Sequence, residues 1–346
     1  MPMSGRDLRA GRSPTGRRQV SLVAQLQWML SSAWLVVLLC AGGAASASEG
    51  NKVLAALAVS PHVYYFQGEA GMAAASNQGF MSNAGFVVTD DGVVVFDSLG
   101  TPVLGAAMIT AIRTITQAPI RRVIVSHYHA DHIYGLQAFK AIGAEVWAHR
   151  SGRAYLNSDM AVARLAERRA SLSPWVDDKT TLIAADRWLD FSNDKVMRFT
   201  MGGVRFQLID VSGAHSDEDI MMFVENDSVL FAGDLYFTGR IPFVGNANSR
   251  VWLTALEHML EVKPAIVIPG HGAKSTDPAA DLRLTRDYLT YLRKVMGAAV
   301  NDMTGFEDAY ARVDWSAFAH YPAFAQANRL NAYGTYILME QESLAK

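Results

Sequence analysis

The stretch RRVIVSHYHADH, residues 121–132, decides the fold more than any other part of the chain. It begins as a short apolar run typical of a buried strand, and it ends in three histidines and an aspartate within six residues. These polar side chains are hard to place in a core, since each buried polar group needs its own partner. In a loop at the end of a strand they can instead converge on one point. Histidine nitrogen and aspartate oxygen both suit a zinc ion, so the stretch predicts a metal site.

Three later residues occupy matching positions. Each directly follows a predicted strand and has a glycine close by, which lets the backbone approach a shared centre: His215, Asp234 and His271. Taken singly, a histidine is more often a structural residue, and an aspartate before a turn is often a cap. Four strand-end sites of metal-ligand type in one chain are much harder to explain in that way. We therefore expect the four sites to share one centre.

The sequence around these sites alternates between strand and helix patterns. Residues 85–89 and 93–96 are predicted strands joined by an Asp-Gly turn, which is typical of a hairpin. Helical spacing of apolar residues predicts helices over 133–142 and 152–170, and the chain beyond Asp277 is helical. The mixture predicts an α/β (α+β) fold in which helices cover the sheets.

The motif H-x-H-x-D-H, followed by the later His, Asp and His, resembles the metallo-β-lactamase superfamily over roughly residues 62–273. This resemblance implies a four-layer αββα sandwich, here with a C-terminal helical extension. It also implies two Zn²⁺ ions as cofactors. The ligands that the resemblance implies for the first zinc are His127, His129 and His215. Those that it implies for the second are Asp131, His132 and His271, with Asp234 bridging the two ions.

The resemblance also implies a mechanism. Two cations a few ångströms apart lower the pKa of a shared water and polarise the bond under attack. Asp131 would orient the bridging hydroxide, so no protein nucleophile is needed. The largest class of zinc β-lactamases has Cys and Lys at the positions of Asp234 and Phe237, which argues against that class in its usual form. The pair Asp131-His132 is instead typical of another β-lactamase class, of glyoxalase II, of lactonases and of RNase Z-like phosphodiesterases.

A longer similarity points to exported zinc hydrolases associated with quinoprotein and sulfur-oxidation systems. It rests on residues 214–219, 231–237, 240–242 and 269–272. Arg240 lies just past the ligand loop, where its planar guanidinium is predicted to receive a substrate carboxylate. The alternative is an arginine paired with an acidic neighbour. Asp97 resembles the acid that orients ligands in this family, and the alternative role is a turn cap.

These observations favour a periplasmic dizinc hydrolase that cleaves an amide, lactone or (thio)ester bond of a small molecule, with β-lactam hydrolysis as a main or side activity. Two alternatives stay open. One is a non-catalytic or accessory metal-binding protein of a quinoprotein or sulfur-oxidation system, and the other is a phosphodiesterase of the same fold, which needs a basic pocket. Substrate choice is expected to depend on residues 154–181, residues 238–250 and the C-terminal helices.

The first 47 residues have the layout of a secretory signal. An arginine-rich start is followed by an apolar run and by the small residues Ala45-Ser46-Ala47, which form an A-x-A cleavage site. The alternative is an uncleaved membrane anchor, and the pair Arg17-Arg18 suggests a twin-arginine export route. The predicted domains are therefore a signal peptide (1–47), a catalytic domain (48–275) and a C-terminal helical extension (276–346) packed on it.

Charge and cysteine content limit the remaining function classes. The whole chain has a formal net charge of −2, but the leader is basic and the remainder is acidic. An acidic protein has no general attraction to nucleic acid, and only an uncleaved leader would tie it to a membrane. The single cysteine, Cys40, lies in the leader, so cysteine nucleophiles and cysteine metal ligands are excluded from the rest of the chain. The expected partner is a small-molecule substrate.

Overall fold

The structure is a computed structural model, and it describes residues 50–345. The predicted signal peptide, residues 1–47, lies outside the described residues. From Asn51 onward the chain forms one compact unit. Within residues 50–345, no helix combines the length and the apolar character that a membrane crossing requires.

Two sheets form the centre of this unit. The larger sheet has the strand order β1-β2-β3-β4-β5-β6-β7. Its strands β4, β5, β6 and β7 are parallel to one another. Its strands are β1 (Leu57–Ala58), β2 (Val63–Phe66), β3 (Ala84–Thr89), β4 (Gly92–Phe96), β5 (Ile120–Ile124), β6 (Glu145–His149) and β7 (Arg187–Leu189). The predicted hairpin corresponds to β3 and β4, in which Thr89 pairs with Gly92.

The smaller sheet has the strand order β12-β11-β10-β9-β8. Its strands are β8 (Val196–Met201), β9 (Val204–Asp210), β10 (Ile220–Val224), β11 (Val229–Phe231) and β12 (Ile266–Ile268). Strands β9 and β11 are both antiparallel to β10, and β11 is parallel to β12. Strands β9, β11 and β12 therefore end at the same edge of this sheet.

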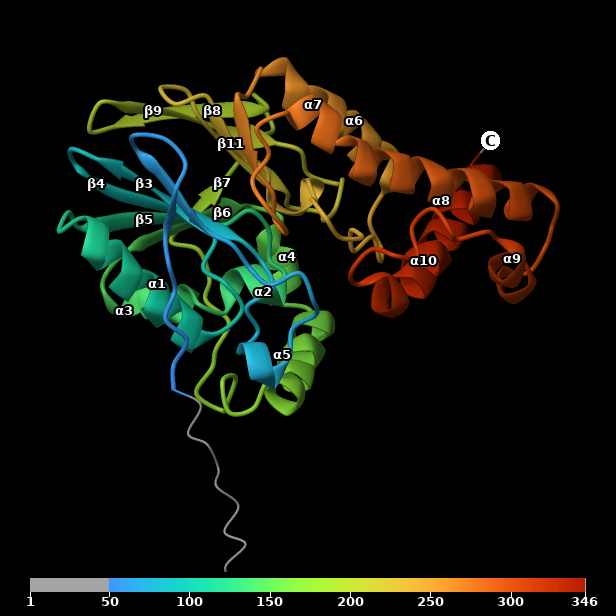
Figure 1. The fold of residues 1–346 in the computed structure, drawn as a ribbon, viewed down its shortest axis with the longest axis horizontal. Coiled ribbons are helices and arrows are strands. Elements are labelled where there is room, and N and C mark those ends of the chain that lie inside the picture. The colour runs from blue at the N-terminus through green and yellow to red at the C-terminus, as the bar shows by residue number, and fades with distance from the viewer. Residues whose placement is uncertain (1–49, 346) are drawn as a thin grey trace, which may run out of the picture. The chain divides into compact units, whose positions relative to one another are not determined.

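Helices cover the outer face of each sheet (Figure 1). The helices of the first half are α1 (Pro102–Ile115), α2 (Ala130–Ile133), α3 (Leu136–Ala141), α4 (Gly152–Leu156) and α5 (Asp159–Ser171), with the short 3-10 helix η1 (Ala75–Asn77) before them. The second half has η2 (Gly233–Leu235), α6 (Ser249–Glu261), α7 (Pro278–Asp281), α8 (Arg283–Asn301), α9 (Phe306–Arg312) and α10 (Phe324–Leu344). Figure 1 shows α8, α9 and α10 together beyond one end of the sheets.

Three buried apolar clusters fill the spaces between four layers. One lies between the larger sheet and its helices and includes Val123 with Leu104 of α1. The second lies between the two sheets, where Ile124 belongs to the same cluster as Leu208. The third joins the smaller sheet to α6, α8 and α10 and includes Trp252. Alternate residues of β5 thus face different clusters, as the period of a strand requires. The predicted four-layer αββα class with a helical C-terminal region is confirmed.

Two predicted helices are each divided in the structure. The predicted helix over 152–170 splits into α4 and α5, because Ser158 adopts an extended backbone and its side chain accepts a hydrogen bond from the Ala161 N–H. The predicted helix over 133–142 is divided at Tyr134 and Gly135, because Ile133 ends α2 and α3 begins at Leu136. Apolar spacing alone did not show these breaks, since both pieces keep an apolar face.

Candidate metal centre

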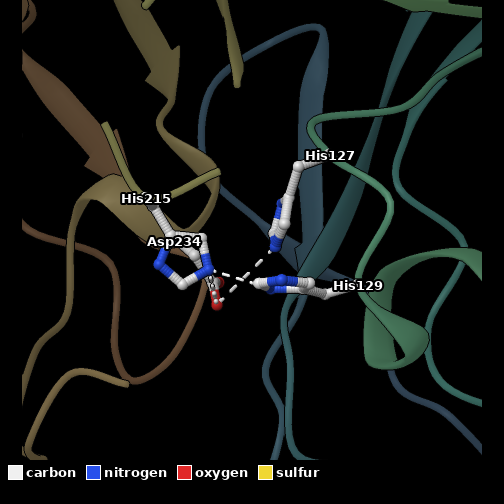
Figure 2. A group of neighbouring side chains, drawn as sticks. All are labelled: His127, His129, His215 and Asp234. Atoms are coloured by element: carbon white, nitrogen blue, oxygen red, sulfur yellow. Dashed lines mark hydrogen bonds and ion pairs between the residues drawn. The ribbon is translucent and has the colours of Figure 1, made fainter. Parts of the chain in front are cut away.

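The loops at the carboxyl ends of β5, β9 and β11 bring four predicted ligands together. Figure 2 shows His127, His129, His215 and Asp234 converging on one point, and their ligand atoms all lie within 4.8 Å of one another. Asp234 Oδ2 is 3.5 Å from His215 Nε2 and 3.9 Å from His127 Nε2. His215 Nε2 is 3.0 Å from His129 Nδ1. The first cluster is thus three imidazoles and one carboxylate oxygen.

The other three predicted ligands form a second cluster of Asp131, His132 and His271. Asp131 Oδ2 is 3.3 Å from His271 Nε2 and 3.6 Å from His132 Nε2. The second oxygen of Asp234, Oδ1, lies 3.1 Å from His132 Nε2 and 3.3 Å from His271 Nε2. Asp234 therefore presents one oxygen to each cluster, which is the arrangement of a bridging carboxylate.

The spacing of these atoms fits metal ions. Four ligands about 2.1 Å from a tetrahedral zinc lie about 3.4 Å from one another. Contacts between carboxylate oxygen and imidazole nitrogen in the two clusters run from 3.1 to 3.9 Å. The buried atoms His127 Nε2, His132 Nε2 and Asp234 Oδ1 have no hydrogen-bond partner among the described residues. Buried polar atoms are rarely left without a partner, and one cation in each cluster would satisfy all three.

Asp97 lies directly behind the ligands. It is 1% exposed, follows β4, and accepts three hydrogen bonds. The Ser126 N–H donates to Oδ1 at 2.7 Å, the Ser126 hydroxyl donates to Oδ2 at 2.7 Å, and His132 Nδ1 lies 2.9 Å from Oδ2. Since the carboxylate can only accept, His132 carries its proton on Nδ1 and turns a bare Nε2 toward the second cluster. Ser126 was not among the predicted site residues.

Backbone contacts orient the last ligand. His271 Nδ1 lies 2.7 Å from the Met81 carbonyl oxygen, which can only accept, so this nitrogen donates and Nε2 faces the cluster. The preceding residue, Gly270, leaves room for the bridging carboxylate. A Cβ atom on Gly270 would lie 2.1 Å from Asp234 Oδ1, so any other side chain would displace that oxygen. This close approach explains the glycine beside the ligand.

Burial and charge divide the histidines into two groups. Burial lowers the pKa of His127, and it lowers the pKa of His215 to about 3, so both imidazoles are neutral, as metal ligands must be. At His132 and His271 burial also acts to lower the pKa, but nearby carboxylates, with Asp234 first, outweigh it and raise the pKa. The carboxylates thus attract positive charge to the second cluster, and a bound cation would replace the protons.

Two further acids, Asp219 and Glu218, hold the ligand loops in place. Asp219 Oδ2 accepts hydrogen bonds from the His215 N–H and the Ser216 N–H, both at 2.7 Å. Glu218 Oε1 accepts the Tyr128 N–H at 3.1 Å, between the first two histidines of the motif. Burial raises the pKa of Glu218 to about 7. Sequence reasoning gave neither acid a role, although the acidic run after His215 was the available signal.

The clusters open into a cavity of about 120 Å³. His129, Asp131, Asp234 and His271 line its floor. Its walls contain Arg240, 1% exposed, together with Met72, Phe243, Tyr155, Arg164 and Arg168. Segments 154–181 and 238–250, where substrate choice was expected to lie, therefore both reach the cavity. A larger hollow of about 580 Å³ lies beside α7 and α8, and no predicted ligand lines it.

Among residues 50–345, no acidic side chain forms an ion pair with Arg240. One of its terminal nitrogens, Nη1, donates to the Gly71 carbonyl at 3.2 Å and lies 3.3 Å from His271 Nδ1. Its Nε is buried without a hydrogen-bond partner among the described residues. Burial lowers the pKa of Arg240, and the charges of Asp234 and Asp131 oppose that shift. The guanidinium is thus held beside the second cluster.

Comparison with known proteins identifies the family. The family description "Metallo-beta-lactamase superfamily" matches residues 77–271, which is more than half of the chain and includes all seven predicted ligands. The chain belongs to the metallo-beta-lactamase superfamily, as the motif predicted. It is 29% identical over 213 residues to a metallo-beta-lactamase type 2 of Bacillus sp. (strain 170), covering 60% of this chain and 70% of that protein. It is 21% identical over 238 residues to a linear primary-alkylsulfatase of Pseudomonas sp. (strain ATCC 19151), covering 58% of this chain and 44% of that one.

Solved structures show the same fold. A stereoselective inverting sec-alkylsulfatase from Pseudomonas sp. superposes with a TM-score of 0.63 at 19% identity, covering 83% of this chain. The chain spans only 50% of that protein's length. A metallo-beta-lactamase from Pontibacter korlensis superposes with a TM-score of 0.51 at 18% identity, covering 68% of this chain and 99% of that one.

Proposed function

We propose that the protein is a periplasmic dizinc hydrolase that cleaves an amide, lactone or (thio)ester bond of a small molecule, with β-lactams among the candidate substrates. The observation that carries this proposal is the pair of clusters that share Asp234 and open into one cavity. The relatives named above are β-lactamases and alkylsulfatases, which are hydrolases. The periplasmic location rests on the predicted signal peptide.

His127, His129 and His215, with Asp234 Oδ2, would hold one zinc. Asp131, His132 and His271, with Asp234 Oδ1, would hold the other. Zinc ions in such a pair lower the pKa of water and stabilise negative charge that develops on the bond under attack.

The chain's own residues position the attacking water. Asp131 lines the cavity, and although burial acts to raise its pKa, His132 and His271 outweigh burial and lower the pKa. Its carboxylate is therefore ionised and can accept a hydrogen bond from water beside the substrate. Asp97 and the Met81 carbonyl fix the tautomers of two ligands, and apolar side chains such as Met72 and Phe243 limit the access of bulk water.

A phosphodiesterase is the second candidate. It requires a basic pocket, and three arginines line the cavity: Arg164, Arg168 and Arg240. An accessory metal-binding role needs no such open cavity over the metal ligands.

The test is turnover by the purified, zinc-loaded protein of a panel that contains nitrocefin, a lactone, a thioester and bis(p-nitrophenyl) phosphate. We expect turnover of at least one amide, lactone or thioester, and its loss in His129→Ala, because His129 is a ligand that lines the cavity. His320→Ala is the matched control, since His320 is exposed and lies outside both clusters. Turnover of the phosphodiester alone would favour the second candidate. No turnover of any member, or full activity in His129→Ala, would overturn the hydrolase proposal.

A further inference from the structure

The cavity over the metal ligands has cationic side chains on two of its walls. On one wall is Arg240, almost fully buried beside His271. Among the described residues, no carboxylate lies within ion-pair distance of its guanidinium, and its Nε has no hydrogen-bond partner. A buried guanidinium with unused donors favours an anion close to it.

The other wall is formed by helix α5. Arg164 and Arg168 lie four residues apart, so both side chains project from the same face of the helix, and both line the cavity. The buried residues Ala161 and Leu165 each precede one of these arginines by three positions, so they lie beside the arginines on the side of α5 that faces the body of the protein.

The two α5 arginines have few anionic partners. Glu167 lies 3.3 Å from Arg164 Nη1 and 3.5 Å from Arg168 Nε, so one carboxylate serves two guanidinium groups. The Glu167 side chain is 47% exposed, and such surface pairs contribute little stability. An incoming anion could therefore replace Glu167 at small cost. Most donors of both guanidinium groups stay available to a ligand.

The charge balance of the cavity favours an anionic ligand. Asp131 and Asp234, the carboxylates that line the cavity, are both metal-ligand candidates. With two zinc ions bound, the three arginines have no anion to neutralise them inside the cavity. A neutral substrate would leave this surplus unpaired, whereas a carboxylate, sulfate or phosphate group matches the planar fork of a guanidinium. Apolar walls at Met72 and Phe243 suit the rest of such a molecule.

We propose that Arg164 and Arg168 of α5 form an anion-binding site, and that the substrate is an organic anion whose carboxylate, sulfate or phosphate group binds there while its scissile bond lies over the metal clusters. This inference rests on the proposed hydrolase function and names its substrate class. Arg240 holds positive charge at the other end of the same cavity. The α5 pair determines specificity and is not part of the metal-ligand machinery.

Calorimetric titration of the zinc-loaded protein tests the site without requiring turnover. The probes share one apolar tail: hexanoate, hexanesulfonate and hexanephosphonate, with hexanol as the neutral reference. We expect Arg164→Gln/Arg168→Gln to weaken binding of at least one anion about tenfold or more, because charged hydrogen bonds are lost, and to leave hexanol unchanged. The anion with the largest loss identifies the class of group that the site takes.

Two matched variants complete the design. Arg150→Gln/Arg198→Gln removes the same charge from exposed arginines that do not line the cavity, and it should leave anion affinity within about twofold of wild type. Glu167→Gln removes the competing carboxylate and should tighten anion binding. The inference is overturned if the α5 double variant binds every anion as tightly as wild type, or if the control pair loses as much affinity. If the protein turns over no substrate but binds anions in a way that depends on Arg164 and Arg168, the result counts against the hydrolase proposal alone.

Discussion

At the residue scale, the candidate metal centre depends on side chains that hold the predicted ligands from behind. Asp97 accepts hydrogen bonds from His132 and from both donors of Ser126, and the Ser126 hydroxyl also lies 2.9 Å from His127 Nδ1. One carboxylate is thereby linked to a ligand of each cluster. Its negative charge and its acceptor-only chemistry fix which nitrogen of each ring faces the metal position.

We expect Asp97→Asn to weaken zinc binding about 10- to 100-fold. An asparagine has one acceptor oxygen where three donors meet, so its amide N–H groups would face His132 Nδ1 and favour the wrong tautomer. Competition with a chromophoric zinc chelator measures the change. Asp227→Asn is the control, because Asp227 makes a similar contact with His62 outside both clusters. Equal zinc affinity in Asp97→Asn and wild type would contradict this role.

The buried carboxyl of Glu218 is expected to make the stability of the protein depend on pH. Burial raises its pKa to about 7 from a usual value near 4.5, so the folded protein holds a proton that the unfolded chain releases between these values. The contribution of Glu218 to the free energy of unfolding is therefore fully present below about pH 4.5. It is lost as the pH rises toward about 7, by an amount on the order of 3 kcal/mol.

Glu218→Gln should remove this part of the pH dependence, since glutamine stays neutral. The measurement is the free energy of unfolding in denaturant at several pH values between about 5 and 7.5, compared between variant and wild type. Glu261→Gln, at an exposed helical position, is the control and should keep the wild-type slope. A Glu218→Gln protein with the same slope as wild type would show that this carboxyl ionises normally.

At the element scale, helix α10 holds the loop that carries Arg240. Asn331 of α10 is fully buried, and its Oδ1 accepts the N–H groups of Val244 at 2.8 Å and Gly245 at 3.2 Å. Its Nδ2 donates to the Pro242 carbonyl at 2.8 Å. The helix backbone also approaches closely, because a Cβ atom on Gly334 would lie 1.8 Å from the Gly245 carbonyl oxygen. The C-terminal extension thus shapes a wall of the cavity.

Asn331→Ala should lower the free energy of unfolding by roughly 3 kcal/mol, because it leaves two N–H groups and one carbonyl buried without partners. Amide hydrogen exchange at Val244 and Gly245 should accelerate by more than exchange in the central strands. Gln326→Ala, at an exposed position on the same helix, should change neither quantity. Unchanged exchange at both amides would mean that other contacts hold the loop.

Elements with a strong local signal were predictable from the sequence, and those that depend on tertiary contacts were not. The hairpin strands over 85–89 and 93–96, joined by an Asp-Gly turn, were predicted within one residue of the observed bounds of β3 and β4. Strand β7, over 187–189, has three residues and is defined by its pairing with β6, so no periodicity revealed it. The arginines of α5 were not singled out, because an arginine on a helix gives no sign of which cavity it faces.

At the scale of the whole molecule, the fold brings distant segments to one edge. The ligands come from loops of both sheets, and the order of the strands places these loops together. The motif and the family resemblance predicted the seven ligands, because ligand spacing within a loop is local. The family resemblance also suggested that Asp97 orients a ligand. The supporting contacts of Met81 and Asn331 join segments far apart in the chain, and spacing in one sequence does not encode them.

We propose that these seven side chains hold two metal ions in adjacent sites. The most direct test is the metal content of the purified protein, measured by elemental analysis after zinc loading and removal of free metal. We predict about two zinc ions per wild-type chain and about one in His127→Ala and in His271→Ala, since each removes a ligand of a different cluster. One zinc or none in the wild type, or two in both variants, would contradict the account.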